Sequence, residues 1–177
     1  MFDGLSLGLD AQANSTFASM RAIESEGKIA NGVEIVPGAF FVIDPEGELE
    51  GSFKTGGEQI LSLSYRVLTP VRWFALHVAA GAFPLENSMI AGLICKSEAE
   101  QAAVTKICLR SGLDGGFRDT FFPKSLVSYA EPSVHIDLVR LDQDSNLILN
   151  AEWREIVFFF PRMDSELALS DLRFFIA

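Results

Sequence analysis

Apolar and polar residues alternate with a period of two along much of the chain. The clearest segment is Gln59–Val67, in which Leu61, Leu63 and Tyr65 alternate with two serines and an arginine. Successive side chains of a β-strand point to opposite faces, so this segment predicts a strand with one buried and one solvated face. The same pattern predicts further strands over residues 38–43, 73–78, 89–96, 134–141, 155–160 and 167–176.

Turn signals separate these segments at short intervals. Asp44-Pro45-Glu46-Gly47 has proline and glycine at the positions that a β-turn favours, and Pro70 separates two strands because proline cannot donate a ladder hydrogen bond. A spacing of about 8–12 residues between turns is typical of sandwiches and barrels. The sequence therefore predicts an all-β fold, a jelly-roll-like sandwich of two antiparallel sheets with at most short helical turns, in a single domain over residues 1–177.

Three segments interrupt this pattern. Ser97-Glu98-Ala99-Glu100 resembles a helical capping box, but residues 104–110 are rich in β-branched side chains, so we expect a hairpin whose connection contains a helical turn. Residues 1–30 are the least readable, and Ser15–Glu24 fits either a short helix or an edge strand. In the last strand the apolar residues change parity at Ser170-Asp171, which predicts a β-bulge or a corner between sheets.

Composition and charge narrow the classes of partner. The net charge is −10 and the Lys and Arg residues are scattered, which argues against nucleic acid and against anionic membrane surfaces. The start of the chain lacks the features of a secretory signal, and the longest uncharged apolar stretch, Trp73–Leu85, is too short to cross a bilayer. We therefore expect a soluble, cytoplasmic protein in which Cys95 and Cys108 are buried thiols rather than a disulfide.

Extending the alternation from strand to strand predicts which side chains share the wet face of a sheet. With Val134, Ile136 and Leu138 assigned to the core, the opposite parity carries Arg66, Trp73, His77, Lys106, Arg110, His135 and Asp137. Trp153 follows a polar stretch and is expected near a rim. The candidate ligand-binding residues are thus Trp73, His77, Arg110, His135, Asp137 and Trp153. Polar residues alternate with core residues on any solvated sheet, so an ordinary wet face remains the alternative.

The order and rhythm of these strands resemble the jelly-roll sandwiches of carbohydrate-binding modules and galactose-binding-like domains. The segments that carry the resemblance are Val33–Ile35 through Gly51–Phe53, Leu61–Val67, and the closing strand Leu169–Phe174. The resemblance implies binding of a saccharide or glycosylated ligand without catalysis. It transfers no binding residue, because these families share no universal one.

Metal and catalytic motifs are weak. His135-Ile136-Asp137 places an imidazole and a carboxylate on one strand face, yet no second histidine is near in sequence, so no metal site is predicted. Asp142, Asp144 and Asn146 match the start of a calcium loop that then fails at Leu147 and Trp153, so a polar turn is expected and structural calcium stays open. No cofactor is predicted. Gly-x-Ser-x-Gly and phosphate-binding loops are absent from the sequence.

Three functions follow from these observations. The first is a non-catalytic module that binds a saccharide through a polar concave sheet face or the end loops. The second is a hydrolase on the same sandwich that uses Asp or Glu with a histidine, so the sequence leaves open whether the protein is an enzyme. The third is an interaction or homodimerisation domain that uses the Phe-rich strand Phe158-Phe159-Phe160.

Overall fold

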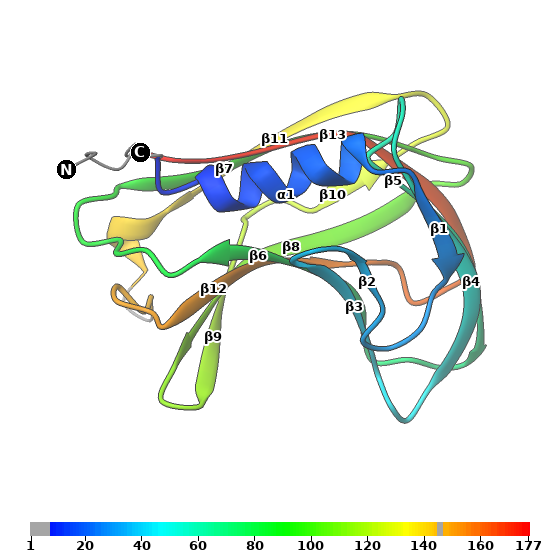
Figure 1. Ribbon diagram of the computed structural model, residues 1–177, viewed down its shortest axis with the longest axis horizontal. Coiled ribbons are helices and arrows are strands. Elements are labelled where there is room, and N and C mark those ends of the chain that lie inside the picture. The colour runs from blue at the N-terminus through cyan, green and yellow to red at the C-terminus, as the bar shows by residue number, and fades with distance from the viewer. Residues whose placement is uncertain (1–7, 145–146) are drawn as a thin grey trace.

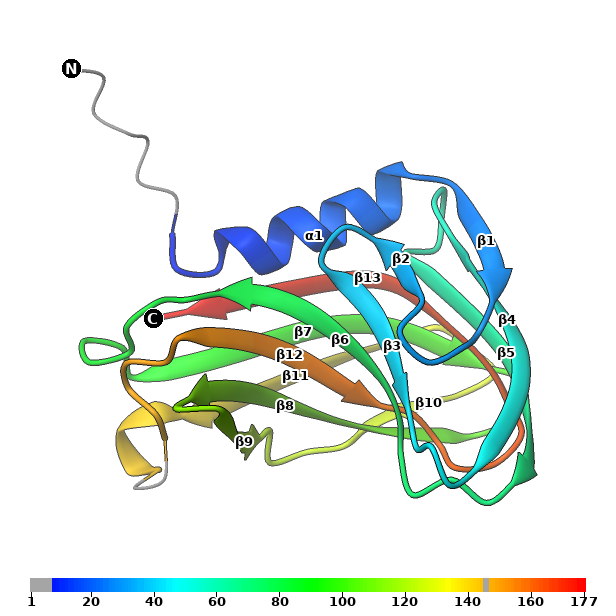
Figure 2. The ribbon, with the colours of Figure 1, turned by 60° about the horizontal axis from the view of Figure 1, so that its bottom comes forward.

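Two antiparallel sheets account for most of the chain. The computed structural model describes residues 8–144 and 147–177, and within them sheet A has the strand order β1-β4-β5-β13-β7-β11. Sheet B has the order β10-β8-β12-β6-β3-β2, with β9 paired to β8. The predicted all-β sandwich of two antiparallel sheets is confirmed, and Figures 1 and 2 show the two layers.

The elements have the following bounds. Sheet A contains β1 (Ser25–Lys28), β4 (Glu48–Thr55), β5 (Leu61–Thr69), β7 (Ile90–Ala99), β11 (Ser133–Arg140) and β13 (Ser165–Ile176). Sheet B contains β2 (Glu34–Val36), β3 (Ala39–Ile43), β6 (Phe74–Gly81), β8 (Ala103–Leu113), β9 (Gly116–Phe121), β10 (Leu126–Ser128) and β12 (Trp153–Phe159). The remaining elements are α1 (Ala11–Ala22) and a 3₁₀ turn, η1 (Leu141–Gln143).

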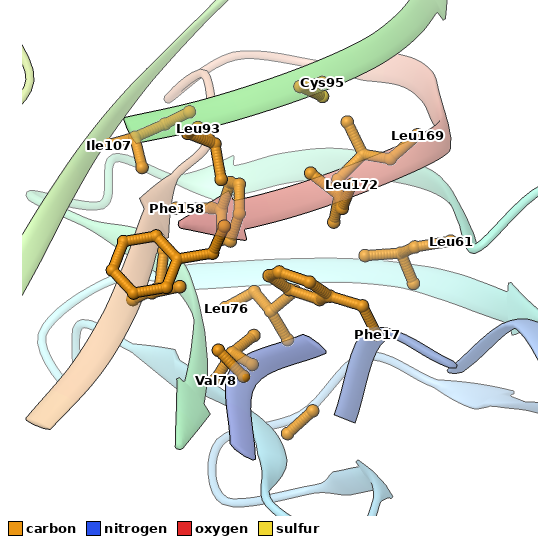
Figure 3. Packing of buried hydrophobic residues seen from close by; sticks show 14 of the residues in the cluster. Phe17, Leu61, Leu76, Val78, Leu93, Cys95, Ile107, Phe158, Leu169 and Leu172 are labelled. Carbon is orange, nitrogen blue, oxygen red and sulfur yellow. The ribbon is translucent and has the colours of Figure 1, made fainter. Parts of the chain in front are cut away.

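The hydrophobic core lies between the sheets. In β5, Leu61, Leu63 and Tyr65 are buried while Ser64 and Arg66 face solvent, as the alternation predicts. Figure 3 shows side chains from both sheets meeting, among them Leu93 of sheet A and Phe158 of sheet B. Burial of so many large apolar side chains is the main stabilising contribution to this fold.

Helix α1 covers an open side of the sandwich (Figure 2). Ala13, Phe17 and Met20 have the spacing of one helical face, and all three are buried in the core. The Phe17 and Phe158 rings pack edge-to-face with their centres 6.5 Å apart. Of the two structures that the sequence left open for this region, the helix is the one that forms.

Strand β13 keeps β7 as a partner and loses β5 at the predicted irregularity. Residues 165–169 pair with β5, the register against β7 shifts between Leu169 and Asp171, and residues 171–176 continue beside β7. The bulge expected at Ser170-Asp171 is therefore confirmed. Beyond it, Asn14 of α1 hydrogen-bonds both backbone groups of Phe174, and Arg21 donates to the carbonyl of Ser170.

The connection between β7 and β8 differs from the expected hairpin. β7 belongs to sheet A and β8 to sheet B, so residues 100–102 carry the chain from one sheet to the other without a helical turn. Ser97 does not cap a helix, because it pairs with Leu169 in the sheet and its hydroxyl accepts a hydrogen bond from Ser128 at 2.8 Å. Tertiary pairing overrides the local capping signal here.

The face that β11 presents to the core is opposite to the one predicted. Val134, Ile136 and Leu138 are exposed, while Asp137 is buried. The Asp137 carboxylate accepts hydrogen bonds from the backbone N–H groups of Leu138 and Lys124, at 2.9 and 2.7 Å. Lys124 Nζ also donates to the carbonyl of Ile136, at 3.3 Å. These partners satisfy the carboxylate inside the protein, which the alternation of apolar residues alone does not reveal.

The two cysteines lie in different sheets. Cys95 is in β7 and Cys108 in β8, and both are buried free thiols. Burial raises the pKa of the Cys95 thiol to about 12. Within residues 8–144 and 147–177, no helix has the length and apolarity needed to cross a membrane.

Candidate functional site

The outer face of sheet B, which points away from the core, carries most of the exposed aromatic and charged side chains of the predicted site. Along one row of paired residues, Phe40, His77, Val157, Cys108 and Phe121 lie side by side across five strands. Ala75, Cys108 and Val157 form a small apolar cluster on this face, separate from the main core. Figure 1 shows the β8–β9 hairpin and the turn between β3 and β4 projecting beyond the sheet in the same direction.

The β8–β9 hairpin follows from a two-residue turn. Asp114 and Gly115 both have positive φ, 53° and 74°, which is the geometry of the type I′ turn that Asp-Gly favours. The turn sets the register in which Arg110 pairs with Asp119 and Gly112 pairs with Phe117. The hairpin thereby extends the outer face of sheet B by a further strand.

Arg110 and Asp119 form a fixed ion pair on this face. Arg110 Nε and Nη2 each donate to the Asp119 carboxylate at 2.7 Å, and the guanidinium lies 3.9 Å from the centre of the Phe117 ring. Both side chains are mostly buried, so the pair is desolvated and held in one geometry. Burial opposes the charged form of Arg110, but its hydrogen bonds to the Asp119 carboxylate and the negative charge of that group outweigh this effect and raise the pKa of Arg110.

A second polar pair lies beside it. His77 Nδ1 and Glu155 Oε2 are 2.6 Å apart, and the Phe40 ring stacks on the His77 imidazole at 5.3 Å. Glu155 pairs with Arg110 across the strands, so the polar groups of β6, β12, β8 and β9 form a continuous band. His77 is buried within this band, while Glu155 keeps partial contact with solvent.

Trp153 lies at one end of the outer face of sheet B, and the position of its indole depends on Gly112. Trp153 pairs with Gly112, and a Cβ placed on Gly112 would meet the indole at 2.0 Å. The missing side chain thus lets the indole lie flat against β8. Trp153 is 38% exposed, which leaves part of the ring available to a ligand.

A hollow of about 810 Å³ lies at the other end of the face, and we call it the aromatic hollow. Its walls include the side chains of Trp73, Phe121, Phe159, Lys106 and Arg162. The Phe121 and Phe159 rings are 5.9 Å apart, and they come from β9 and from the strand β12.

Arg72 completes the aromatic hollow and is anchored by a buried carboxylate. Asp44 accepts hydrogen bonds from the backbone N–H, Nε and Nη2 of Arg72 at 2.8–2.9 Å. The guanidinium also lies 4.8 Å from the centre of the Trp73 ring. The Arg72 hydrogen bonds hold the pKa of Asp44 well below its usual range. Arg72 and Trp73 are thus held in place before any ligand arrives.

Four of the six predicted ligand-binding residues share this face, and two do not. Trp73 lines the aromatic hollow, Trp153 lies at the opposite end, and His77 and Arg110 lie between them. His135 and Asp137 lie on β11 in sheet A. Because the parity of β11 is reversed, they point inward there. Burial lowers the pKa of His135, and its Nε2 has no hydrogen-bond partner in the described part of the chain.

The residues that sequence reasoning missed come mainly from the strands β9 and β12. They are Phe117, Asp119, Phe121, Glu155 and Phe159, together with Phe40 and Arg162. A usable signal for the β9 residues was present in Asp114-Gly115. Counting backward and forward from a two-residue I′ turn pairs residues 112 with 117 and 110 with 119, which places Phe117 and Asp119 beside Arg110.

The stretch considered for calcium is only partly described. Asp142 accepts hydrogen bonds from Arg140, and Asp144 accepts one from Thr120 at 3.0 Å. Asn146 lies outside the described residues. Among the residues that the structure describes, no group of three or more His, Cys, Asp or Glu side chains has the geometry of a metal site.

The fold is similar to that of carbohydrate-binding modules of known structure. A CBM4 structure has a TM-score of 0.59 at 10% identity and covers 85% of this chain and 95% of its own. The family 11 module of a Clostridium thermocellum cellulase has a TM-score of 0.52 at 10% identity, covering 88% and 96%. The CBM22-1 xylan-binding domain from Paenibacillus barcinonensis has a TM-score of 0.50 at 6% identity, covering 88% and 96%.

These matches are between structures and not between sequences. The sequence matches no protein-family model and no curated protein. At such low identities the likeness defines the fold class, a carbohydrate-binding-module-like β-sandwich, and any role of individual residues has to be argued from this chain.

Proposed function

We propose that this protein is a non-catalytic saccharide-binding module and that the sugar binds along the outer face of sheet B. The observation that carries the proposal is the arrangement of this face, with aromatic side chains at both ends of a band of fixed polar groups. Trp73, Phe121 and Phe159 line one end, and Trp153 lies at the other. Arg110 and Glu155 lie between the two ends.

This arrangement suits a sugar chain chemically. The C–H faces of a pyranose ring pack on flat aromatic rings, and hydroxyl groups exchange hydrogen bonds with carboxylates and guanidinium groups. The Arg110–Asp119 and His77–Glu155 pairs are already formed, so little conformational entropy is lost when a ligand binds. Two of the similar structures are described as a xylan-binding domain and as a complex with a β-1,3-1,4-mixed-linked tetrasaccharide, which supports this class of ligand.

Titration calorimetry with xylo-oligosaccharides and mixed-linked glucan oligosaccharides tests the proposal. We expect binding to at least one of them, and we expect Trp73→Ala and Trp153→Ala each to weaken it about tenfold, since an aromatic contact is worth about 0.5–1.5 kcal/mol. Tyr129→Ala is the matched control, because Tyr129 is an exposed aromatic residue that follows β10 and does not line the aromatic hollow. Absence of binding to every oligosaccharide, neutral or acidic, would refute the proposal.

One observation favours a second candidate, a hydrolase. His77 and Glu155 meet at 2.6 Å beside the Arg110–Asp119 pair, so a histidine and two carboxylates share one face. Release of reducing sugar during prolonged incubation with a bound oligosaccharide, abolished in Glu155→Gln, would establish this activity. An unchanged oligosaccharide would support a module that only binds.

The third candidate function is homodimerisation through the Phe-rich strand, and the burial of these phenylalanines limits which of them could contact a second copy. Phe158 and Phe160 point into the core, and Phe159 is the one of these three phenylalanines that reaches the outer face of sheet B. A homodimer through this strand would therefore have to use Phe159 and the aromatic hollow. Sizing chromatography of the wild type and of Phe159→Ala tests that arrangement.

A further inference from the structure

The aromatic hollow is lined by basic side chains, although the protein as a whole is acidic. The chain carries 24 acidic and 14 basic residues, yet among the residues that the structure describes the hollow is lined by Arg72, Lys106 and Arg162 and by no aspartate or glutamate. Asp44 and Glu46 neutralise Arg72, so Lys106 and Arg162 supply the positive charge at this end of the outer face of sheet B, on a protein of net charge −10.

Two of these cations, Lys106 and Arg162, have no acidic partner in the described part of the chain. Within residues 8–144 and 147–177, neither Lys106 nor Arg162 takes part in an ion pair or a side-chain hydrogen bond. Lys106 lies on β8, where it pairs with Phe159 of β12, and Arg162 follows the end of β12. The aromatic rings and the two free cations therefore line the same hollow.

The carboxylates that contact Arg72 and Arg110 are already engaged. The Asp44 carboxylate accepts hydrogen bonds from Arg72, and Glu46 Oε2 lies 3.3 Å from Nη2 of the same guanidinium. The Asp119 carboxylate accepts hydrogen bonds from both Nε and Nη2 of Arg110. An incoming anion would therefore meet Lys106 and Arg162 without displacing an internal partner.

We infer that the aromatic hollow binds an anionic sugar residue, so that the ligand of this module is an acidic saccharide. This inference rests on the proposed function and adds the charge of the ligand. A carboxylate of a uronic acid or a sulfate ester fits the same site, because either one accepts charge-assisted hydrogen bonds from Lys and Arg. The ring of the same sugar packs on Trp73 or Phe159, where partial exclusion of water strengthens the ion pairs.

The test compares neutral and charged ligands on one backbone. We would measure binding by calorimetry to cello-oligosaccharides, to their C6-carboxylate derivatives and to their sulfate esters. The same comparison would be made between unsubstituted and glucuronic acid-substituted xylo-oligosaccharides. Measurements at about 20 and 300 mM NaCl separate electrostatic binding from stacking, because salt screens the former. A preference for carboxylate over sulfate, or the reverse, tells which anion the site selects.

A charge-matched pair of variants isolates the hollow. Lys106→Gln/Arg162→Gln removes its two unpaired cations, and Arg66→Gln/Lys96→Gln removes one exposed Arg and one exposed Lys from the outer face of sheet A. We expect the first variant to weaken binding of the charged oligosaccharide about tenfold at low salt, with affinity for the neutral one unchanged. The second variant should leave both affinities within about twofold of the wild type.

The outcomes distinguish the two proposals. Equal affinity for neutral and charged ligands, or an equal loss in both variants, would overturn the anionic specificity and leave saccharide binding in place. If no oligosaccharide of either backbone binds, saccharide binding and anionic specificity fall together.

Discussion

Asn14 makes two hydrogen bonds to the backbone of Phe174. Its Oδ1 accepts from the Phe174 N–H at 3.0 Å, and its Nδ2 donates to the Phe174 carbonyl at 2.7 Å. A neighbouring strand would satisfy the same two groups, but β5 pairs with β13 only as far as Leu169. One side chain of α1 thus replaces a strand along the free part of β13, and it fixes the helix to sheet A.

We expect Asn14→Ala to lower the free energy of unfolding by about 1–3 kcal/mol, because two partly buried hydrogen bonds are lost. Urea denaturation measures the change. Ser15→Ala is the control, since Ser15 is exposed on the same helix and gains a similar helix propensity. In hydrogen exchange, the Phe174 amide should exchange faster in Asn14→Ala. Unchanged protection would contradict this role of Asn14.

Gly112→Ala should displace Trp153 without removing its indole, because the new Cβ would meet the ring at 2.0 Å. We expect a shift in tryptophan fluorescence and a loss of saccharide affinity close to that of Trp153→Ala. Gly116→Ala, in the same hairpin, is the control because its Cβ would meet only the Leu113 carbonyl at 3.7 Å. A Gly112→Ala protein with wild-type affinity would mean that the position of Trp153 is irrelevant to binding.

The Asp44–Arg72 pair should make stability depend on acid pH. The pKa of Asp44 in the folded protein lies below the value of about 3.9 for an unfolded chain. The unfolded state therefore takes up this proton first, and the stabilisation is complete above about pH 5 and declines as the pH falls through 4. Asp44→Asn should lower stability at pH 7 and flatten this acid slope. Asp114→Asn, at the exposed hairpin turn, should leave the slope unchanged.

Arg154 is expected to be a major contributor to stability. It is 1% exposed and donates to the carbonyls of Phe83, Ile148 and Leu149 and to the Ser111 hydroxyl. Burial lowers the pKa of its guanidinium to about 10. Arg154→Met leaves several buried acceptors without a donor, so we expect a loss of about 3–5 kcal/mol in urea denaturation. Arg66→Met, on an exposed position of β5, should change stability by less than about 0.5 kcal/mol.

The strands that alternate cleanly could be predicted from the sequence, and so could the bulge in β13. In β5 the apolar residues Leu61, Leu63 and Tyr65 identify the buried face correctly, because one face of this strand packs in the core and the other is exposed to solvent. The change of parity at Ser170-Asp171 is likewise a local feature. Four of the six candidate binding residues share one face for the same reason: the alternation of β6, β8 and β12 predicts which side chains lie together once those strands are paired.

The remaining errors concern tertiary partners. Asp137 is buried only because Lys124 and Leu138 supply backbone donors, and one of these donors is thirteen residues away in the chain. Ser97 carries a capping signal that its pairing with Leu169 overrides. The pairing of β9 with β8 could have been derived from Asp114-Gly115, whereas the contribution of Phe40 depends on β3 lying beside β6, which no local signal encodes.

The hydrogen bonds around Asp137 explain how the exposed strand β11 can occupy the rim of sheet A. A rim strand with apolar side chains such as Val134, Ile136 and Leu138 is a ready template for another chain, and stacked copies of such segments grow into fibrils. Lys124 and Asp137 already occupy the Ile136 carbonyl and the Leu138 amide. Two of the backbone groups with which a second chain would pair are thus already hydrogen-bonded within the protein, which weakens this strand as a template for self-association although its apolar side chains face solvent.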